Sequence, residues 1–231
     1  MVYHPFRSLG RYVMAACAVS LVAVSLSAQK PATASVSGSN PSRADIFLGS
    51  TYFSAHGTLQ PAGIPYTSIS QGAIGSYAYY FNKHSLNQHL GFEGVYTNNV
   101  VNHASPSDGA VGISGGPIYR LSPVNNITFF VHGLFGAEQL TGPNSKYPPA
   151  TAEYEPAKWG FGLTAGGGMD IAMPFCNHLS LRLFEVDYRY SHVNFGPYAG
   201  LPTSAPVALG GTTDLNAIEL STGIVVHFGH M

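Results

Sequence analysis

The sequence predicts an all-β protein, an eight-stranded antiparallel up-and-down transmembrane β-barrel with short periplasmic turns and long extracellular loops. Stretches in which apolar and polar residues alternate recur along the chain, and a period of two is the period of a β-strand. Charged residues make up only 9% of the chain, against roughly 25% in an ordinary soluble protein. The connections between these stretches are alternately short and long, which is the arrangement of outer-membrane barrels.

The N-terminal segment predicts export. Residues 1–28 carry two arginines near their start, continue with an apolar run and end with small residues, which is the order of a secretory signal peptide. The apolar run, residues 12–26, is shorter than the roughly 20 residues of a spanning helix, so we expect cleavage rather than an uncleaved anchor. Residues 29–43 then form a flexible leader rich in Pro, Ser and Ala, and residues 44–231 form the barrel.

The last strand shows the alternation best. In Thr213–Phe228, every second residue from Ile218 onward is apolar or Thr, and the residues between them are mostly polar or small. The facing of the first strand is ambiguous because apolar residues occupy both of its faces. In the seventh strand the alternation changes phase near Phe184, and a β-bulge there would restore it. The seven earlier strands are predicted at residues 45–54, 71–82, 86–98, 109–121, 126–139, 158–173 and 178–193.

The lengths of the connections separate the two ends of the barrel. A soluble sandwich has no reason to sort its connections by length, whereas an outer-membrane barrel has short turns in the periplasm and long loops outside. The long connections are predicted at residues 55–70, 99–108, 140–157 and 194–212. The short connections are predicted at residues 83–85, 122–125 and 174–177.

The charged residues indicate which face points inward. Alternation alone does not decide this, because a soluble lipocalin-type barrel has the same period with an apolar interior. The polar face consists mostly of Gly, Ser, Thr and Ala, which is too sparse in charge for a coat exposed to water. We therefore predict a polar, filled interior whose charges pair, because an unpaired buried ion costs several kcal/mol. The predicted interior charge network is Glu93, Asp170, Arg182, Glu185, Asp187, Arg189 and Glu219.

Aromatic residues on the apolar face fall near the two ends of the strands, where membrane interfaces favour them. The predicted outer-rim aromatics are Tyr96, Phe135, Trp159, Phe161, Tyr188 and Tyr190. The predicted inner-rim aromatics are Tyr79, Phe81, Tyr119, Phe129 and Phe228. A strand inside a membrane must pair along both edges, so the last strand is expected to pair with the first and close the barrel. In that arrangement Glu219 lies within reach of Arg182 or Arg189.

Several segments together resemble the small OmpA-like and OmpX-like outer-membrane β-barrel proteins. They are DIFLGSTYF (45–53), GGPIYRL (115–121), FGLTAGGGMDI (161–171), RLFEVDYRYSHV (182–193) and LSTGIVVHF (220–228). In such proteins the barrel assembly machinery reads a terminal aromatic of the last strand, and Phe228 matches that role. The resemblance covers about residues 45–228, which is the barrel domain alone, so no peptidoglycan-binding function is expected.

The expected function is non-enzymatic, either in envelope structure or in binding an extracellular ligand through the long loops. A narrow solute or ion pore is the first alternative. A lipid A-modifying enzyme is the second, because His178 and Ser180 have the His-x-Ser spacing of such a deacylase. A net charge of −1 gives no electrostatic case for nucleic acid. No cofactor or metal is expected, because a processed chain keeps only Cys176, which excludes a disulfide framework and a cysteine zinc cluster.

Overall fold

The computed structural model describes residues 42–66, 69–81, 89–100, 109–141, 157–176, 178–198 and 210–230. The predicted signal peptide and the leader up to residue 41 lie outside the described residues, whereas Ser42 and Arg43 already belong to the first strand. In the described part of the chain, no helix is long and apolar enough to cross a membrane.

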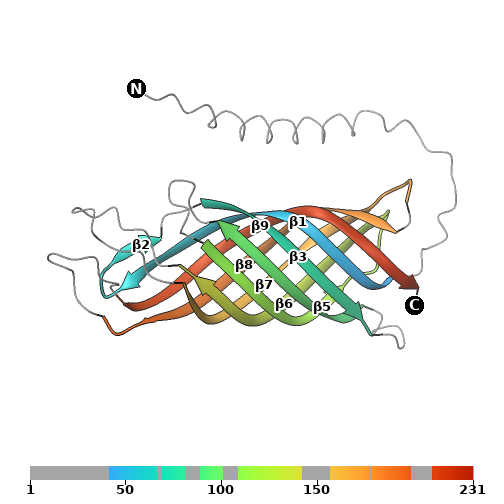
Figure 1. Cartoon of the computed structure of the whole chain (residues 1–231). Coiled ribbons are helices and arrows are strands. Elements are labelled where there is room, and N and C mark those ends of the chain that lie inside the picture. The colour runs from blue at the N-terminus through green and yellow to red at the C-terminus, as the bar shows by residue number, and fades with distance from the viewer. Residues whose placement is uncertain are drawn as a thin grey trace, which may run out of the picture. The chain divides into compact units, whose positions relative to one another are not determined.

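Strands follow one another along the described residues (Figure 1). All eight predicted strands are present, and β2 is a short additional strand. The strands are β1 Ser42–Gln60, β2 Ile64–Tyr66, β3 Ile69–Tyr80, β4 Leu90–Val100, β5 Gly109–Arg120, β6 Ile127–Leu140, β7 Lys158–Ala172, β8 Leu179–Gly196 and β9 Gly211–His230.

The strands form one closed antiparallel sheet. β1 and β3 to β9 pair in sequence order, and β9 also pairs with β1 from Ser42↔His230 to Gln60↔Thr212. β2 pairs with the last residues of β1. The predicted eight-stranded up-and-down barrel, closed by its first and last strands, is therefore confirmed. We call the end of the barrel that holds Ser42 and His230 the turn end, and the opposite end the loop end.

The first strand is longer than the sequence analysis predicted. β1 continues past Ser54 to Gln60, because Ala55 and Leu59 keep the inward alternation and are buried while β1 pairs with β9. The predicted end of this strand was therefore wrong, and part of the predicted long connection at 55–70 is strand.

The barrel has an apolar outer face. On β1, whose facing was ambiguous, Phe47 and Phe53 are each 1% exposed and point inward, whereas Leu48 between them is 64% exposed. The other strands also expose large apolar side chains on one face and bury polar or charged side chains on the other. The polarity of this barrel is therefore the reverse of that of a lipocalin-type barrel.

β8 contains a β-bulge. Its pairing with β7 shifts between Met169↔Phe184 and Asp170↔Arg182, and its pairing with β9 shifts in the same place. The extra residue lets Arg182 and Glu185 both point into the barrel although they lie three positions apart, and both are buried. The bulge predicted near Phe184 is therefore confirmed.

Apolar side chains fill much of the interior. The cluster at the loop end is Phe53, Ala55, Leu59, Tyr66, Ala110, Leu140, Val193, Phe195, Leu215 and Ala217. The middle cluster is Phe47, Ile74, Val95, Leu134 and Val225. The cluster near the turn end is Ala78, Tyr80, Ile118 and Phe130. We call the cluster at the loop end the apolar plug, and the charged side chains lie between it and the turn end.

One rung of the seam between β1 and β9 has no room for side chains. Gly49 pairs with Gly223. A Cβ atom at Gly223 would lie 2.2 Å from the carbonyl oxygen of Leu48 and 2.8 Å from the ring of Phe47. Because Gly223 has no side chain, the buried ring of Phe47 can occupy the space next to it.

We predict that Gly223→Ala lowers the free energy of unfolding by about 1–3 kcal/mol, because the added methyl group must displace backbone or the Phe47 ring. The measurement is a urea titration of the folded barrel, followed by gel mobility without boiling. The control is Gly133→Ala, where an added Cβ would meet nothing within 4 Å. Equal stability of the two variants would show that the seam accepts a side chain.

Candidate functional site

Charged side chains gather inside the barrel. The structure places all seven residues of the predicted network in the interior, where they are 1–7% exposed. Four further buried residues accompany them, namely Asp45, Arg120, His132 and Glu138. The predicted residues fall into groups around Arg182, His132 and Arg189, and a separate group lies at the turn end.

Arg182 is held between carboxylates and aromatic rings. Its guanidinium donates to Asp170 at 2.9 Å and to Glu185 at 3.2 Å. It also lies between the rings of Phe47 and Phe130, 4.1 and 4.0 Å from their centroids. A planar guanidinium makes both kinds of contact at once, which the ammonium group of lysine does not. These contacts compensate a full positive charge in the middle of the barrel.

His132 lies at the centre of an acidic group. Its Nδ1 is 2.7 Å from Oε2 of Glu93, and its Nε2 is 3.0 Å from Oδ1 of Asp187. The same Nε2 is 3.9 Å from Oε1 of Glu185. Three carboxylates from β4 and β8 thus surround one imidazole from β6, and none of these four side chains is more than 5% exposed.

Arg189 joins two carboxylates nearer the loop end. Its guanidinium forms an ion pair with Glu138 at 3.1 Å and a second ion pair with Glu219. The hydroxyl of Ser191 donates to Glu138, and the ring centroid of Phe53 lies 5.0 Å from the guanidinium carbon. The predicted reach between Glu219 and Arg189 is therefore confirmed.

A separate polar group lies at the turn end. Arg120 donates at 2.9 Å to Asp45 and also to the hydroxyl and carbonyl oxygens of Ser42. Its guanidinium lies 3.8 Å from the ring centroid of Tyr80. Nδ1 of His227 is 2.6 Å from the other carboxylate oxygen of Asp45. Each buried arginine of the described residues thus pairs with a carboxylate and faces an aromatic ring.

Ser180, His227 and Asp45 have the hydrogen-bond order of a hydrolase triad. The Ser180 hydroxyl is 2.6 Å from Nε2 of His227, and Asp45 contacts Nδ1 of the same ring. A nucleophile must also reach its substrate, but Ser180 is only 4% exposed and Asp45 is also engaged by Arg120. The deacylase alternative needed Ser180 on the lipid-facing side beside His178. In this structure Ser180 points inward and is buried.

Carboxylates outnumber arginines in the interior. The buried carboxylates are Asp45, Glu93, Glu138, Asp170, Glu185, Asp187 and Glu219, and the buried arginines are Arg120, Arg182 and Arg189. Seven minus three leaves four negative charges if His132 and His227 are neutral, and two if both are protonated. Because a buried charge must be compensated, the excess carboxylates need either further positive charge or a proton of their own.

The rim aromatics predicted from the sequence lie on the outward face, where they are exposed or half-buried. Phe135 and Tyr190 flank the same residue of β7. Nearer the turn end, Tyr79 and Phe228 flank Ala44 of β1. These pairs lie at two levels along the barrel, and Phe228 faces outward two residues before β9 ends.

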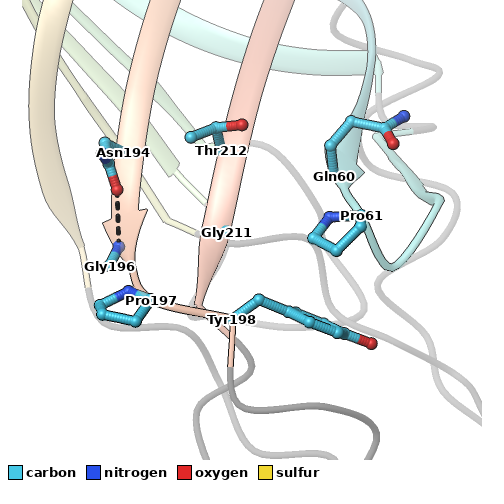
Figure 2. A pocket seen from close by; sticks show the side chains of 8 residues that line it. All are labelled: Gln60, Pro61, Asn194, Gly196, Pro197, Tyr198, Gly211 and Thr212. Atoms are coloured by element: carbon cyan, nitrogen blue, oxygen red, sulfur yellow. Dashed lines mark hydrogen bonds between the residues drawn. The ribbon is translucent and has the colours of Figure 1, made fainter.

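The loop end carries an open hollow of about 570 Å³ where β1, β8 and β9 end (Figure 2). Its lining residues are Gln60, Pro61, Asn194, Gly196, Pro197, Tyr198, Gly211 and Thr212. It combines an aromatic ring with amide and hydroxyl groups, which is the mixture found in many small-ligand sites. The predicted loops at 140–157 and 194–212 lie mostly outside the described residues.

Five interior residues were not among those predicted: Asp45, Arg120, His132, Glu138 and His227. A signal was present, because the last four fall on the polar faces of their predicted strands. Asp45, Phe47 and Phe53 are all odd-numbered and therefore share one face of the first strand. Placing the charge of Asp45 inside the barrel would have predicted that this face points inward. The grouping of His132 with Glu185 and Asp187 arises from the register of β6, β7 and β8, so no ligand spacing in the sequence indicates it.

The chain matches no protein-family model and no curated protein sequence. Its structure is similar to Ail, the attachment invasion locus protein of Yersinia pestis, at 14% identity and a TM-score of 0.39 over 80% of this chain and 99% of that chain. It is also similar to the outer membrane protein OprG from Pseudomonas aeruginosa, at 14% identity and a TM-score of 0.41 over 84% and 99%. The N-terminal β-barrel domain of Pseudomonas aeruginosa OprF gives 11% and 0.39 over 79% and 98%. Similarity this low transfers no ligand or activity to this chain.

We predict that Arg189→Met lowers the free energy of unfolding by about 3–5 kcal/mol, because it leaves the carboxylates of Glu138 and Glu219 buried without their cation. Glu219→Ala should lower the free energy of unfolding by less than Arg189→Met, because Arg189 keeps its ion pair with Glu138. The measurement is the urea titration of the folded barrel.

The control for this prediction is Asp214→Asn. The side chain of Asp214 is 60% exposed, so the change should stay within about 0.5 kcal/mol. If Arg189→Met is no less stable than Asp214→Asn, the network does not stabilise the barrel.

Proposed function

We propose that this chain is a non-enzymatic integral protein of the bacterial outer membrane, exported by its signal peptide. It acts in envelope structure or through an interaction at its loop end. The observation that carries this proposal is the polarity of the barrel, which is apolar outside and charged inside. A barrel in water buries its apolar face, so the reverse polarity is expected for a barrel in lipid.

The apolar outer face extends around the whole barrel. Each of the eight barrel strands contributes at least one large apolar side chain that is 42–64% exposed. Examples in strand order are Leu48, Tyr77, Phe92, Ile113, Phe135, Leu163, Val186 and Ile224. Soluble monomers rarely expose contiguous apolar patches of more than a few hundred Å². The closed sheet also pairs the backbone groups of every barrel strand, which a lipid environment requires.

The interior favours a structural role over a pore. The apolar plug at the loop end includes Phe53, Leu59 and Leu215, each at most 1% exposed. Below it, the carboxylates and arginines contact each other directly. An eight-stranded barrel is just wide enough for its side chains to fill, so conduction would require both layers to rearrange.

The absence of catalysis belongs to the same proposal. The residues with a catalytic order, Ser180, His227 and Asp45, are inside the barrel, where Ser180 is 4% exposed. Its burial and the engagement of Asp45 by Arg120 support a structural role for this group.

Two contacts with other molecules follow from the proposal. Phe228 lies outward at the end of β9, which suits recognition of the last strand by the barrel assembly machinery during insertion. The hollow that includes Gln60, Asn194 and Tyr198 is the described part of the surface that suits an extracellular ligand. Ligands commonly bind at the loops of a rigid scaffold.

We predict that the protein fractionates with the outer membrane and is heat-modifiable. Unboiled samples should migrate differently from boiled samples, because the closed barrel resists detergent until it is heated. The measurements are membrane fractionation, detergent phase partition and gel mobility. Partition into the aqueous phase with unchanged mobility would remove the membrane assignment.

We predict no reproducible conductance steps from the folded protein in a planar bilayer, because the plug and the charge network fill the interior. Insertion is checked by the heat-dependent mobility of protein recovered from the same lipid. Steady steps of one size would establish the pore alternative and contradict a sealed interior.

A further inference from the structure

We propose that the barrel interior binds one divalent cation of the zinc class between His132, Glu185 and Asp187. Three atoms, one from each residue, lie within 4.8 Å of one another, and all three residues are buried. This inference concerns the interior alone and does not depend on the membrane assignment.

The distances suit tetrahedral coordination. Nε2 of His132 lies 3.0 Å from Oδ1 of Asp187 and 3.9 Å from Oε1 of Glu185. Metal–ligand bonds of about 2.0–2.1 Å in a tetrahedron place neighbouring ligand atoms roughly 3.3 Å apart. The two observed distances lie on either side of that value, and all three ligand atoms lie within 4.8 Å of one another, so small rotations of the two carboxylate side chains would complete the site. Three protein ligands also leave the fourth position open for water.

The surrounding residues hold the ligand atoms in position. Oε2 of Glu93 is 2.7 Å from Nδ1 of His132, so Nδ1 would keep its proton and donate to Glu93 when a cation takes the lone pair of Nε2. Metal-binding histidines commonly donate their other ring N–H to a carboxylate, which fixes the orientation of the ring. In Glu185, Oε2 accepts from Ser221 at 2.6 Å and from Arg182 at 3.2 Å, so Oε1 remains for the ion.

Gly166 makes room for this arrangement. It pairs with His132 on one side and with Asp187 on the other, so the three residues occupy one rung. A Cβ atom at position 166 would lie 1.9 Å from Oδ1 of Asp187. The missing side chain therefore lets the carboxylate of Asp187 reach across β7 towards the imidazole.

Unpartnered polar atoms lie in a small cavity beside Asp187. Oε1 of Glu219 and Oγ1 of Thr97 are buried and have no hydrogen-bond partner among the described residues. Both residues, together with Asp187, line a cavity of about 10 Å³. A cavity of this size holds about one water, so a polar molecule fits next to one of the three proposed ligands.

The charge balance favours a cation over an empty site. With neutral histidines, the interior carries four negative charges beyond its arginines, and a divalent ion halves that excess. The alternative occupant is a proton that makes His132 an imidazolium, which would donate to both Glu93 and Asp187. One imidazole with two carboxylates favours zinc or a similar transition metal over calcium, which takes only oxygen ligands.

The test compares metal loading of three refolded proteins. Full-length wild type, His132→Gln and His192→Gln are refolded in detergent with ZnCl₂, because the interior is closed once the barrel has formed. His192 is the matched control, since its side chain is 49% exposed and does not face the interior group. Bound zinc is measured by mass spectrometry after gel filtration, and CoCl₂ replaces zinc for visible absorption spectra.

The expected result is roughly one zinc per chain for wild type and His192→Gln, and none for His132→Gln. Cobalt should give the intense absorption of a tetrahedral site in the first two proteins only. Zinc should also raise the temperature of the mobility shift in wild type, and EDTA during refolding should prevent this rise.

Three results would overturn the proposal. Wild type that folds without metal, and whose stability ZnCl₂ leaves unchanged at pH 8, would assign the place to a proton on His132. Equal zinc in His132→Gln would place the ion elsewhere. Weak octahedral cobalt absorption in wild type would exclude the three-ligand site. If His132→Gln does not fold, Asp187→Asn replaces it and should lower the amount of bound zinc, because it keeps the size of the side chain and removes an anionic ligand.

Discussion

Compensation of buried charge is the constraint on which the rest of the interior depends. The barrel encloses seven carboxylates with three arginines, and each arginine contacts both a carboxylate and an aromatic ring. The ring contacts explain why bulky aromatics such as Phe47 and Phe130 point inward in a barrel with an apolar exterior. The excess of carboxylates then leaves His132 among three acidic side chains, where a buried negative charge is compensated only by a proton or a cation.

Closure of the sheet supplies the frame for these contacts. β1 and β9 pair along almost their whole length, and both run further towards the loop end than β3 and β4 do. This extension carries Phe53, Leu59 and Leu215 into the apolar plug. The paired glycines Gly49 and Gly223 bring the two backbones together at the rung where Phe47 lies beneath the seam. The pairing of β1 with β9 thus closes the sheet, and the extended ends of these strands cover the charge network at the loop end.

The apolar exterior and the filled interior together restrict the functions that suit this barrel. An apolar exterior on every strand favours lipid as the surroundings, and a filled interior favours a structural element over a conduit. The Ser180, His227 and Asp45 group illustrates the difference between geometry and access. Its hydrogen bonds have a catalytic order, yet the hydroxyl is buried and the carboxylate also binds Arg120. Surface contacts are therefore expected at the loop end, where Tyr198 and Gln60 border an open hollow.

The number of barrel strands, their order, the bulge near Phe184 and the outward facing of the apolar residues on every strand but the first could be predicted from the residues alone. These features depend on local alternation and on connection length, which a single strand displays without its neighbours. The tertiary structure alone decided which interior residues meet. Contacts such as His132 with Asp187 across Gly166 depend on the register of three strands and on the shear of the closed barrel, which alternation does not encode. For the same reason the extension of β1 past Ser54 became visible only from its pairing with β9, because Gly57 and polar neighbours obscure the alternation there.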